Sequence, residues 1–139
     1  MAGSKTILII EDDRFISEMY ARTLEKAGYV VAIATTGQEG IDTAFRTRFD
    51  VILLDIMLPI KHGMQVLKEI RESTNENVRD ARVVIMTNFD QDEESRAVMQ
   101  AQADGYLIKA NITPSKLVKI IGQLFPREPG AKDVPQERV

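Results

Sequence analysis

Short runs of apolar residues recur along the chain, and between them apolar residues return every three or four positions. The runs lack the strict alternation of half-exposed strands, which is typical of strands that are covered on both faces. The segments between them have the period of amphipathic helices. The pattern therefore predicts five buried strands joined by helices. The strands are expected at residues 6–10, 30–34, 51–54, 83–86 and 106–108.

Start and stop signals mark the helices. Asp13 is placed to cap the first helix and Gly28 to end it, and Thr113 before Pro114 is typical of the start of the last helix. The other helices are expected at about 37–48, 64–72 and 91–103, with capping boxes at Thr36–Glu39 and Asp90–Glu93, and Ser73–Ala81 is expected to be a surface loop. The residues expected to face the core are Ile16, Met19, Tyr20, Leu24, Ala27, Ile41, Ala44, Phe45, Val66, Leu67, Ile70, Leu117, Val118, Ile121 and Leu124.

The regular alternation of strands and helices predicts the topology. Parallel strands with right-handed crossovers place helices on both faces of one sheet, so the expected fold is α/β and doubly wound. The carboxyl ends of the strands then share one edge, which is where open α/β folds bind ligands. Periodicity alone leaves the order of the strands open.

Composition limits the class of protein further. With 139 residues, 44% of them hydrophobic and 28% charged, the chain has the size and composition of one globular domain. The absence of cysteine excludes disulfides and thiolate sites and fits a cytoplasmic protein. The net charge of -3 without a basic run argues against direct nucleic-acid contact, and no apolar stretch is long enough to span a membrane.

Three segments are expected along the chain. Residues 6–125 contain all the predicted strands and helices and form the folded domain. Residues 1–5 are expected to be a disordered N-terminus or a cloning remnant. Residues 126–139 hold three of the five prolines, which predicts a Pro-rich tail or the start of a linker.

Polar side chains follow four of the five apolar runs. Glu11 and Asp12 follow the first, Asp55 the third, Thr87 the fourth and Lys109 the fifth. Three crowded carboxylates repel one another unless a cation is near, and their oxygens suit Mg²⁺, so a magnesium site is expected. A carboxylate also accepts a phosphoryl group as an acyl phosphate. Asp55 is the best acceptor, with Lys109 and Thr87 placed to contact the phosphoryl oxygens.

These residues and their separations resemble those of the receiver domain of two-component response regulators. The resemblance covers about residues 6–125 and implies a flavodoxin-like, doubly wound (βα)5 three-layer sandwich with the sheet order 2-1-3-4-5. The motifs that carry it are the acidic pair Glu11-Asp12, the segment Asp55-Ile56-Met57-Leu58-Pro59, the switch hydroxyl Thr87, the switch aromatic Tyr106 and the strand-five lysine Lys109.

The resemblance implies a phosphorelay switch and no enzyme beyond its own phosphorylation and dephosphorylation. Asp55 is expected to receive a phosphoryl group from a histidine kinase, a phosphotransfer protein or a small phosphodonor. The implied Mg²⁺ ligands are Glu11, Asp12, Asp55 and the backbone carbonyl of Met57. Thr87 and Tyr106 are expected to relay the state to the face of the fourth helix, fifth strand and fifth helix. A downstream protein, an effector domain or a second copy of the chain would bind there.

The chain departs from the family pattern at two positions. Ala110 follows Lys109 where the family usually has proline, so we expect a trans peptide bond and a looser loop before the last helix. His62 stands where an acidic residue is common, and we expect no effect on the chemistry. Phe89, two residues after Thr87, is expected to tune the access of water to the acyl phosphate.

Three other functions compete with this interpretation. A pseudo-receiver would bind partners without phosphorylation, although the complete acidic set disfavours it. An aspartate-nucleophile phosphatase similar to the haloacid-dehalogenase family would carry an aspartate two residues after the nucleophile, where this chain has Met57. A flavodoxin would need small and hydroxyl residues after the first strand, and Glu11, Asp12 and Asp13 would repel the flavin phosphate.

Overall fold

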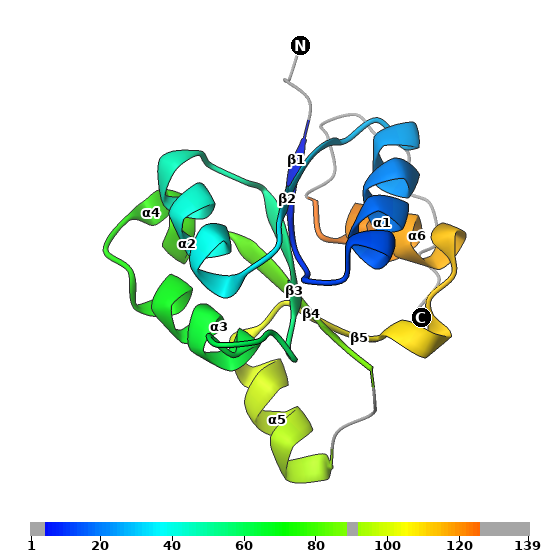
Figure 1. The fold of residues 1–139 in the computed structure, drawn as a ribbon. Helices are drawn as coiled ribbons and strands as arrows, with labels where there is room; N and C mark the ends of the chain where they lie inside the picture. Colours follow the sequence, from blue (N-terminus) through cyan, green and yellow to red (C-terminus); the bar gives the residue numbers. More distant parts are fainter. Residues whose placement is uncertain (1–4, 89–91, 126–139) are drawn as a thin grey trace.

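The computed structural model describes residues 5–88 and 92–125, and it alternates strands and helices along the chain (Figure 1). The strands are β1 (Thr6–Ile10), β2 (Val30–Ala34), β3 (Val51–Asp55), β4 (Arg82–Thr87) and β5 (Gly105–Ile108). The helices are α1 (Arg14–Lys26), α2 (Gly37–Arg46), α3 (Gly63–Glu72), α4 (Glu76–Arg79), α5 (Glu93–Gln102) and α6 (Pro114–Gln123), with a 3₁₀ turn η1 (Lys109–Asn111) before α6. The disordered start and the Pro-rich tail stay predictions, because residues 1–4 and 126–139 lie outside the described residues.

The strands form one parallel sheet with the order β2-β1-β3-β4-β5. In this order β1 lies beside β3, and Ile10 is in register with Leu54. Helices α1 and α6 cover one face, whereas α2, α3, α4 and α5 lie on the other (Figure 1). The predicted doubly wound fold and the strand order implied by the family resemblance are both confirmed.

Each face of the sheet has its own core. Leu8 and Ile10 of β1 pack toward α2 and α3, whereas Ile7 and Ile9 pack toward α1 and α6. All four side chains are fully buried. Burial on both faces explains why the strands appear in the sequence as continuous apolar runs.

Three of the predicted helix caps and the predicted stop of α1 are confirmed. Side-chain oxygens of Asp13, Thr36 and Thr113 accept hydrogen bonds from backbone N–H groups three residues further on, at 3.1, 3.0 and 3.3 Å. Gly28, just after α1, has a φ of 101°, a conformation that favours glycine. The predicted capping box Asp90–Glu93 is wrong, because α5 begins at Glu93 and its cap is Asp92, which accepts from the Ser95 N–H at 2.8 Å.

Some predicted inward residues point to solvent. Met19 is 38% exposed because it lies on the side of α1 opposite to the buried face, which holds Ser17, Tyr20, Ala21 and Leu24. Phe45 is 45% exposed because α2 packs through Gly40, where a Cβ would lie 2.4 Å from the Ile10 Cδ1 atom. Ala27, just after the last turn of α1, is exposed as well.

The segment Ser73–Ala81 is not a plain surface loop as predicted. It contains the one-turn helix α4, which places Val78 in the core with no exposed surface, and Ala81 is also buried. Asn and charged residues surround one apolar anchor here, so the average polarity of the segment concealed the buried position.

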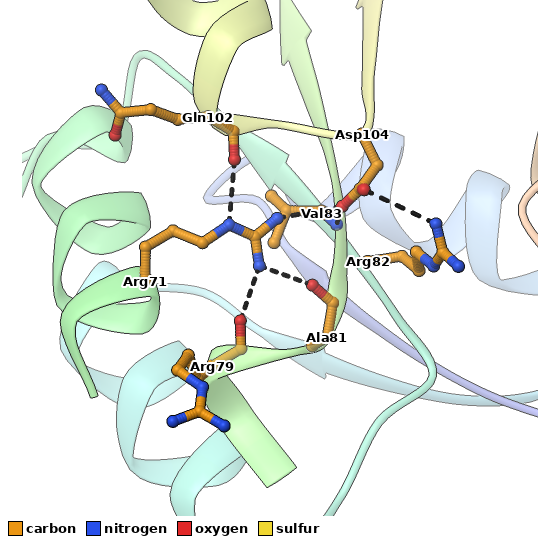
Figure 2. A network of polar contacts seen from close by, with 7 residues as sticks. All are labelled: Arg71, Arg79, Ala81, Arg82, Val83, Gln102 and Asp104. Carbon is orange, nitrogen blue, oxygen red and sulfur yellow. Dashed lines mark hydrogen bonds and ion pairs between the residues drawn. The ribbon is translucent and has the colours of Figure 1, made fainter. Parts of the chain in front are cut away.

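A polar network closes the amino edge of the sheet beside α4 (Figure 2). The Arg71 guanidinium at the end of α3 donates to the carbonyls of Gln102, Arg79 and Ala81 at 2.9, 2.9 and 2.7 Å, and to Asp104 Oδ2 at 2.9 Å. One side chain therefore holds the ends of α3, α4 and α5 and the start of β4 together. The same Asp104 oxygen accepts the backbone N–H at the second residue of β4, at 2.8 Å.

Replacement of Arg71 is expected to destabilise the fold. Arg71→Ala removes the guanidinium donor from three carbonyls and from Asp104, which keeps the bond from the Val83 N–H, and we expect the free energy of unfolding to fall by about 2–3 kcal/mol. Arg71→Lys should recover only a minor part, because an ammonium lacks the planar fork of donors. Urea denaturation measures the free energy of unfolding of both variants.

The matched control is Arg82→Ala. Arg82 lies 3.8 Å from Asp104 with its side chain 54% exposed, so its loss should cost less than about 0.5 kcal/mol. Equal losses for Arg71→Ala and Arg82→Ala would contradict the role assigned to the Arg71 network.

Candidate functional site

The predicted site residues meet at the carboxyl edge of the sheet. Glu11 directly follows β1, Asp55 ends β3, Thr87 ends β4 and Lys109 directly follows β5. Glu11 and Thr87 are fully buried and Asp55 is 2% exposed. Asp12 is exposed at the surface of the same edge. Parallel strands account for this arrangement, because the carboxyl ends of all strands lie at one edge only when the strands point the same way.

Three carboxylates form one cluster. One carboxylate oxygen from each of Glu11, Asp12 and Asp55 lies within 4.8 Å of the others. Such a group of oxygens suits a divalent cation, Mg²⁺ included. The structure thus brings together the three side chains that were predicted as metal ligands.

Lys109 supplies positive charge to this cluster. Its ammonium is hydrogen-bonded to the Glu11 carboxylate and lies 3.4 Å from Asp55 Oδ2. Burial disfavours the charged form of Lys109, but the bond to Glu11 and the charges of Asp55 and Glu11 outweigh it, so the pKa of Lys109 is raised. One ammonium against three carboxylates leaves the pocket with excess negative charge when all of them are ionised.

Glu11 carries much of the cost of this crowding. Its burial, together with the adjacent Asp55 carboxyl group, raises the pKa of Glu11 from 4.5 to about 7, although the Lys109 ammonium acts in the opposite direction. Its Oε2 atom also accepts the Asp13 backbone N–H at 3.2 Å. Near neutral pH, the raised pKa therefore favours a proton on Glu11, or a cation in addition to Lys109.

The loop after β3 is held tightly against Asp55. The Met57 N–H donates to Asp55 Oδ1 at 3.1 Å, and the Gly63 N–H donates to the Ile56 carbonyl at 3.0 Å. A Cβ on residue 63 would lie 2.4 Å from the Asp55 carbonyl oxygen, so only glycine permits this approach. The role of the Met57 carbonyl as a metal ligand stays a prediction.

The two predicted switch residues lie on neighbouring strands. Thr87 is buried at the end of β4, while Tyr106 of β5 is half-buried and packs against the core on the side of α2 and α3. Tyr106 is in register with Ile85, two residues before Thr87. Their switching role stays a prediction.

The positions that depart from the family pattern have local roles. The peptide bond before Ala110 is trans, as predicted, and Ala110 lies within η1. His62 lies outside the acidic cluster and caps α3, with its Nδ1 atom accepting the Met64 N–H at 3.2 Å. Sequence reasoning missed this cap, although the position just before the glycine that opens α3 was a usable signal. Phe89 lies outside the described residues.

The described helices give no sign of a membrane segment. Within residues 5–88 and 92–125, no helix combines the length and apolar character that a bilayer crossing requires.

Comparisons with known proteins agree with this geometry. The model of the response regulator receiver domain family matches residues 7–122. The response regulator MprA of Mycolicibacterium vanbaalenii is 36% identical over 103 residues, which cover 74% of this chain and 43% of MprA. The chain thus spans less than half the length of this curated relative.

Solved structures share the fold. A CheY-like receiver domain protein from Methanospirillum hungatei is 31% identical, with a TM-score of 0.76 over 88% of this chain and 94% of that one. The response regulator TrrA from Thermotoga maritima, solved in complex with Mg²⁺ and BeF, is 27% identical, with a TM-score of 0.75 over 87% of this chain and 99% of TrrA.

The raised pKa of Glu11 predicts how stability depends on pH without metal. Between pH 4.5 and 7, Glu11 holds a proton in the folded state that it releases in the unfolded state. The stability that Glu11 contributes is therefore fully present below pH 4.5 and is lost as the pH rises through 7. The loss due to Glu11 is expected to reach at most about 3 kcal/mol. Urea denaturation in EDTA from pH 5 to 8 measures it.

Glu11→Gln is the matched variant for this measurement. It cannot ionise, so its stability should decline less over the same range, and Mg²⁺ should stabilise the wild type more at pH 8 than at pH 5. Parallel pH curves for the two proteins would show that Glu11 is not the titrating group.

Proposed function

This chain belongs to the response regulator receiver domain family, a family of signalling modules rather than classical enzymes, and on that premise we propose that it is a phosphoacceptor switch phosphorylated on Asp55. The observation that carries the proposal is the position of Asp55. It ends the central strand β3, belongs to the cluster with Glu11 and Asp12, and has Lys109 3.4 Å away.

Asp55 is a better acceptor than its neighbours. The Glu11 carboxylate is engaged by the Lys109 ammonium and the Asp13 N–H, and Asp12 is exposed to water. Asp55 is shielded from bulk water, and its Oδ1 atom is oriented by the Met57 N–H. A shielded, oriented carboxylate suits attack on phosphorus and slows hydrolysis of the product.

The transfer joins one Asp55 carboxylate oxygen to phosphorus as the bond from phosphorus to the donor breaks. The electron pair of that bond leaves with the donor, which is an imidazole nitrogen of phosphohistidine or the leaving oxygen of a small phosphodonor, and the donor is then protonated. Lys109 neutralises charge on the phosphoryl oxygens, and the Thr87 hydroxyl donates a hydrogen bond to one of them. Hydrolysis returns free Asp55 and inorganic phosphate.

The acidic residues define the cofactor in this proposal. Glu11, Asp12, Asp55 and the Met57 carbonyl would hold Mg²⁺, which supplies the positive charge that the transferring phosphoryl group requires. The carboxylate cluster supports this choice, as does the relative TrrA, whose structure contains Mg²⁺ and BeF.

The signal leaves the site through Thr87 and Tyr106. A phosphoryl group that contacts Thr87 in only one of two arrangements shifts the population toward that arrangement. Tyr106 then changes its packing, and with it changes the surface formed by α5, β5 and α6. We call this surface the α5–β5–α6 face; α5 and α6 are the fourth and fifth helices predicted from the sequence. Family membership implies a cognate histidine kinase, and the α5–β5–α6 face would bind an effector domain, a downstream protein or a second copy of the chain. The proposed location is the cytoplasm.

Phosphorylation of Asp55 is tested with a small donor. Incubation with acetyl phosphate and Mg²⁺ should give one acyl phosphate, detected by intact-mass spectrometry and mapped to Asp55 after borohydride reduction. Asp55→Asn should abolish the signal, because an amide does not form the acyl phosphate. The control Asp42→Asn changes an exposed aspartate of α2 and should react like the wild type. A wild-type protein that stays unmodified would contradict the proposal and favour a pseudo-receiver, which binds partners without phosphorylation.

The Thr87 switch is tested separately from the chemistry. With Mg²⁺ and beryllium fluoride, hydrogen exchange of the wild type should change in α5, β5 and α6. Thr87→Ala should still bind the ligand but lose this change, because no hydroxyl links the ligand to β4 and β5. An identical exchange response in both proteins would remove Thr87 from the relay.

A further inference from the structure

Strand β2 lies at one end of the sheet, between α1 on one face and α2 on the other (Figure 1). The Val30 N–H donates to the Lys5 carbonyl at 2.9 Å, so the peptide groups of Val30 and of every second residue after it face β1. Val31 and Ile33 direct their N–H and C=O groups to the opposite side. Among the described residues no strand pairs with that side of β2. The sheet therefore leaves two donors and two acceptors of β2 unpaired at this edge.

The sequence of β2 does not protect this edge. The residues of β2, Val30–Ala34, are all apolar, and they pair with β1 without a bulge. Val30 is 54% exposed, and the next three side chains are only partly buried. Edge strands usually carry a charge, a proline or a bulge, because an unmodified edge pairs readily with another strand. The absence of these features from β2 indicates that its edge binds a further strand.

A second copy of β2 fits this edge in the antiparallel orientation. With a two-fold axis at Ala32, Val31 of each copy lies opposite Ile33 of the other, and each such pair exchanges two N–H···O=C hydrogen bonds. Every outward N–H and carbonyl group of the two strands is then paired. Residues on the axis lie opposite their own copies, with Cβ atoms about 4.5–5.5 Å apart, and the small side chain of Ala32 permits this approach.

Charges on α1 fit the same two-fold axis. Glu18, Arg22 and Glu25 line a hollow of about 280 Å³ together with Ile33, so they lie on the side of α1 that faces the free edge. Antiparallel strands place the two α1 helices antiparallel on the same face of the joined sheet. Glu18 and Arg22 are equally far from the middle of α1, so Glu18 of each copy lies near Arg22 of the other. Two pairs of opposite charges therefore form across the axis.

We infer that two copies of this chain associate through β2, in a two-fold dimer that joins their sheets into one. The inference is independent of the proposed phosphorylation. β2 and β5 lie at opposite ends of the sheet, so the α5–β5–α6 face stays free in the dimer. The contact consists of one short strand and one helix from each copy, so we expect a weak dimer, with a Kd of about 10–100 µM.

Sedimentation equilibrium and amide hydrogen exchange test the dimer and its contact. Between about 10 µM and about 1 mM protein, the wild type should change from monomer to dimer. The N–H groups of Val31 and Ile33, followed by NMR, should exchange at least about threefold more slowly at about 1 mM than at about 50 µM, because each becomes hydrogen-bonded across the axis. The Val30 N–H is already bonded to Lys5 and should not change.

Charge reversal on α1 tests the register. Glu18→Arg places like charges opposite each other and should weaken the dimer at least about fivefold. The double variant Glu18→Arg with Arg22→Glu restores opposite charges and should recover the wild-type Kd within about twofold. The matched control is Glu72→Arg, which reverses an exposed glutamate at the end of α3 and should leave the dimer unchanged.

Three results would overturn the inference. A wild type that stays monomeric at about 1 mM would leave the edge to an extended segment of another protein. A dimer whose Val31 and Ile33 amides exchange as fast as in the monomer would use another surface. So would a dimer that Glu18→Arg and Glu72→Arg weaken equally, or that the double variant does not restore.

Discussion

Crowding of negative charge at one edge of the sheet is the constraint on which the site depends. Parallel strands bring Glu11, Asp12 and Asp55 together, and a single ammonium, that of Lys109, lies between two of them. The Lys109 ammonium offsets part of this charge, and burial together with the adjacent Asp55 raises the pKa of Glu11, which favours its protonated form. A cation that binds there would replace the proton and stabilise the fold. The same crowding that weakens the metal-free protein therefore favours a divalent ion, and so prepares the pocket for a phosphoryl group.

The sheet was predictable from sequence to within about one residue per strand, because its strands appear as apolar runs, although the edge strands β2 and β5 are only partly buried. The strand order was not derivable from periodicity and came from the family resemblance. Helix faces were harder to predict. The buried faces of α1 and α2 combine large apolar residues with small ones such as Ser17, Ala21 and Gly40, and Met19 and Phe45 lie off those faces. The hydrophobicity of a residue alone therefore did not predict which helix residues face the core, because small residues also pack there.

Features that depend on distant parts of the chain were missed. The bonds of Arg71 join segments up to 33 residues apart, and no local pattern indicates them. The φ of 67° at Ile60, in the loop after β3, is not indicated by any local sequence pattern either. By contrast, Glu11, Asp55, Thr87 and Lys109 were found because a parallel sheet converts a local signal, a polar residue after an apolar run, into a shared position. Local patterns therefore identified the side chains that gather at the site but not the contacts that support it.

The amino edge of the sheet carries the Arg71 network and the carboxyl edge carries the acidic cluster, and α5 runs between these two edges. At the amino edge Arg71 holds the end of α5 through the Gln102 carbonyl. Along its length α5 buries only Met99, whereas α1, α2 and α3 each bury four residues. Displacing the start of α5 thus removes little apolar surface from the core, while its end stays attached. Elements of low local stability are the ones able to respond to a small change in free energy. Thr87 lies five residues before the cap of α5, so a change at Thr87 would act on a helix that is displaced at a low cost in free energy. The weak packing of α5 thus gives the proposed relay a physical basis.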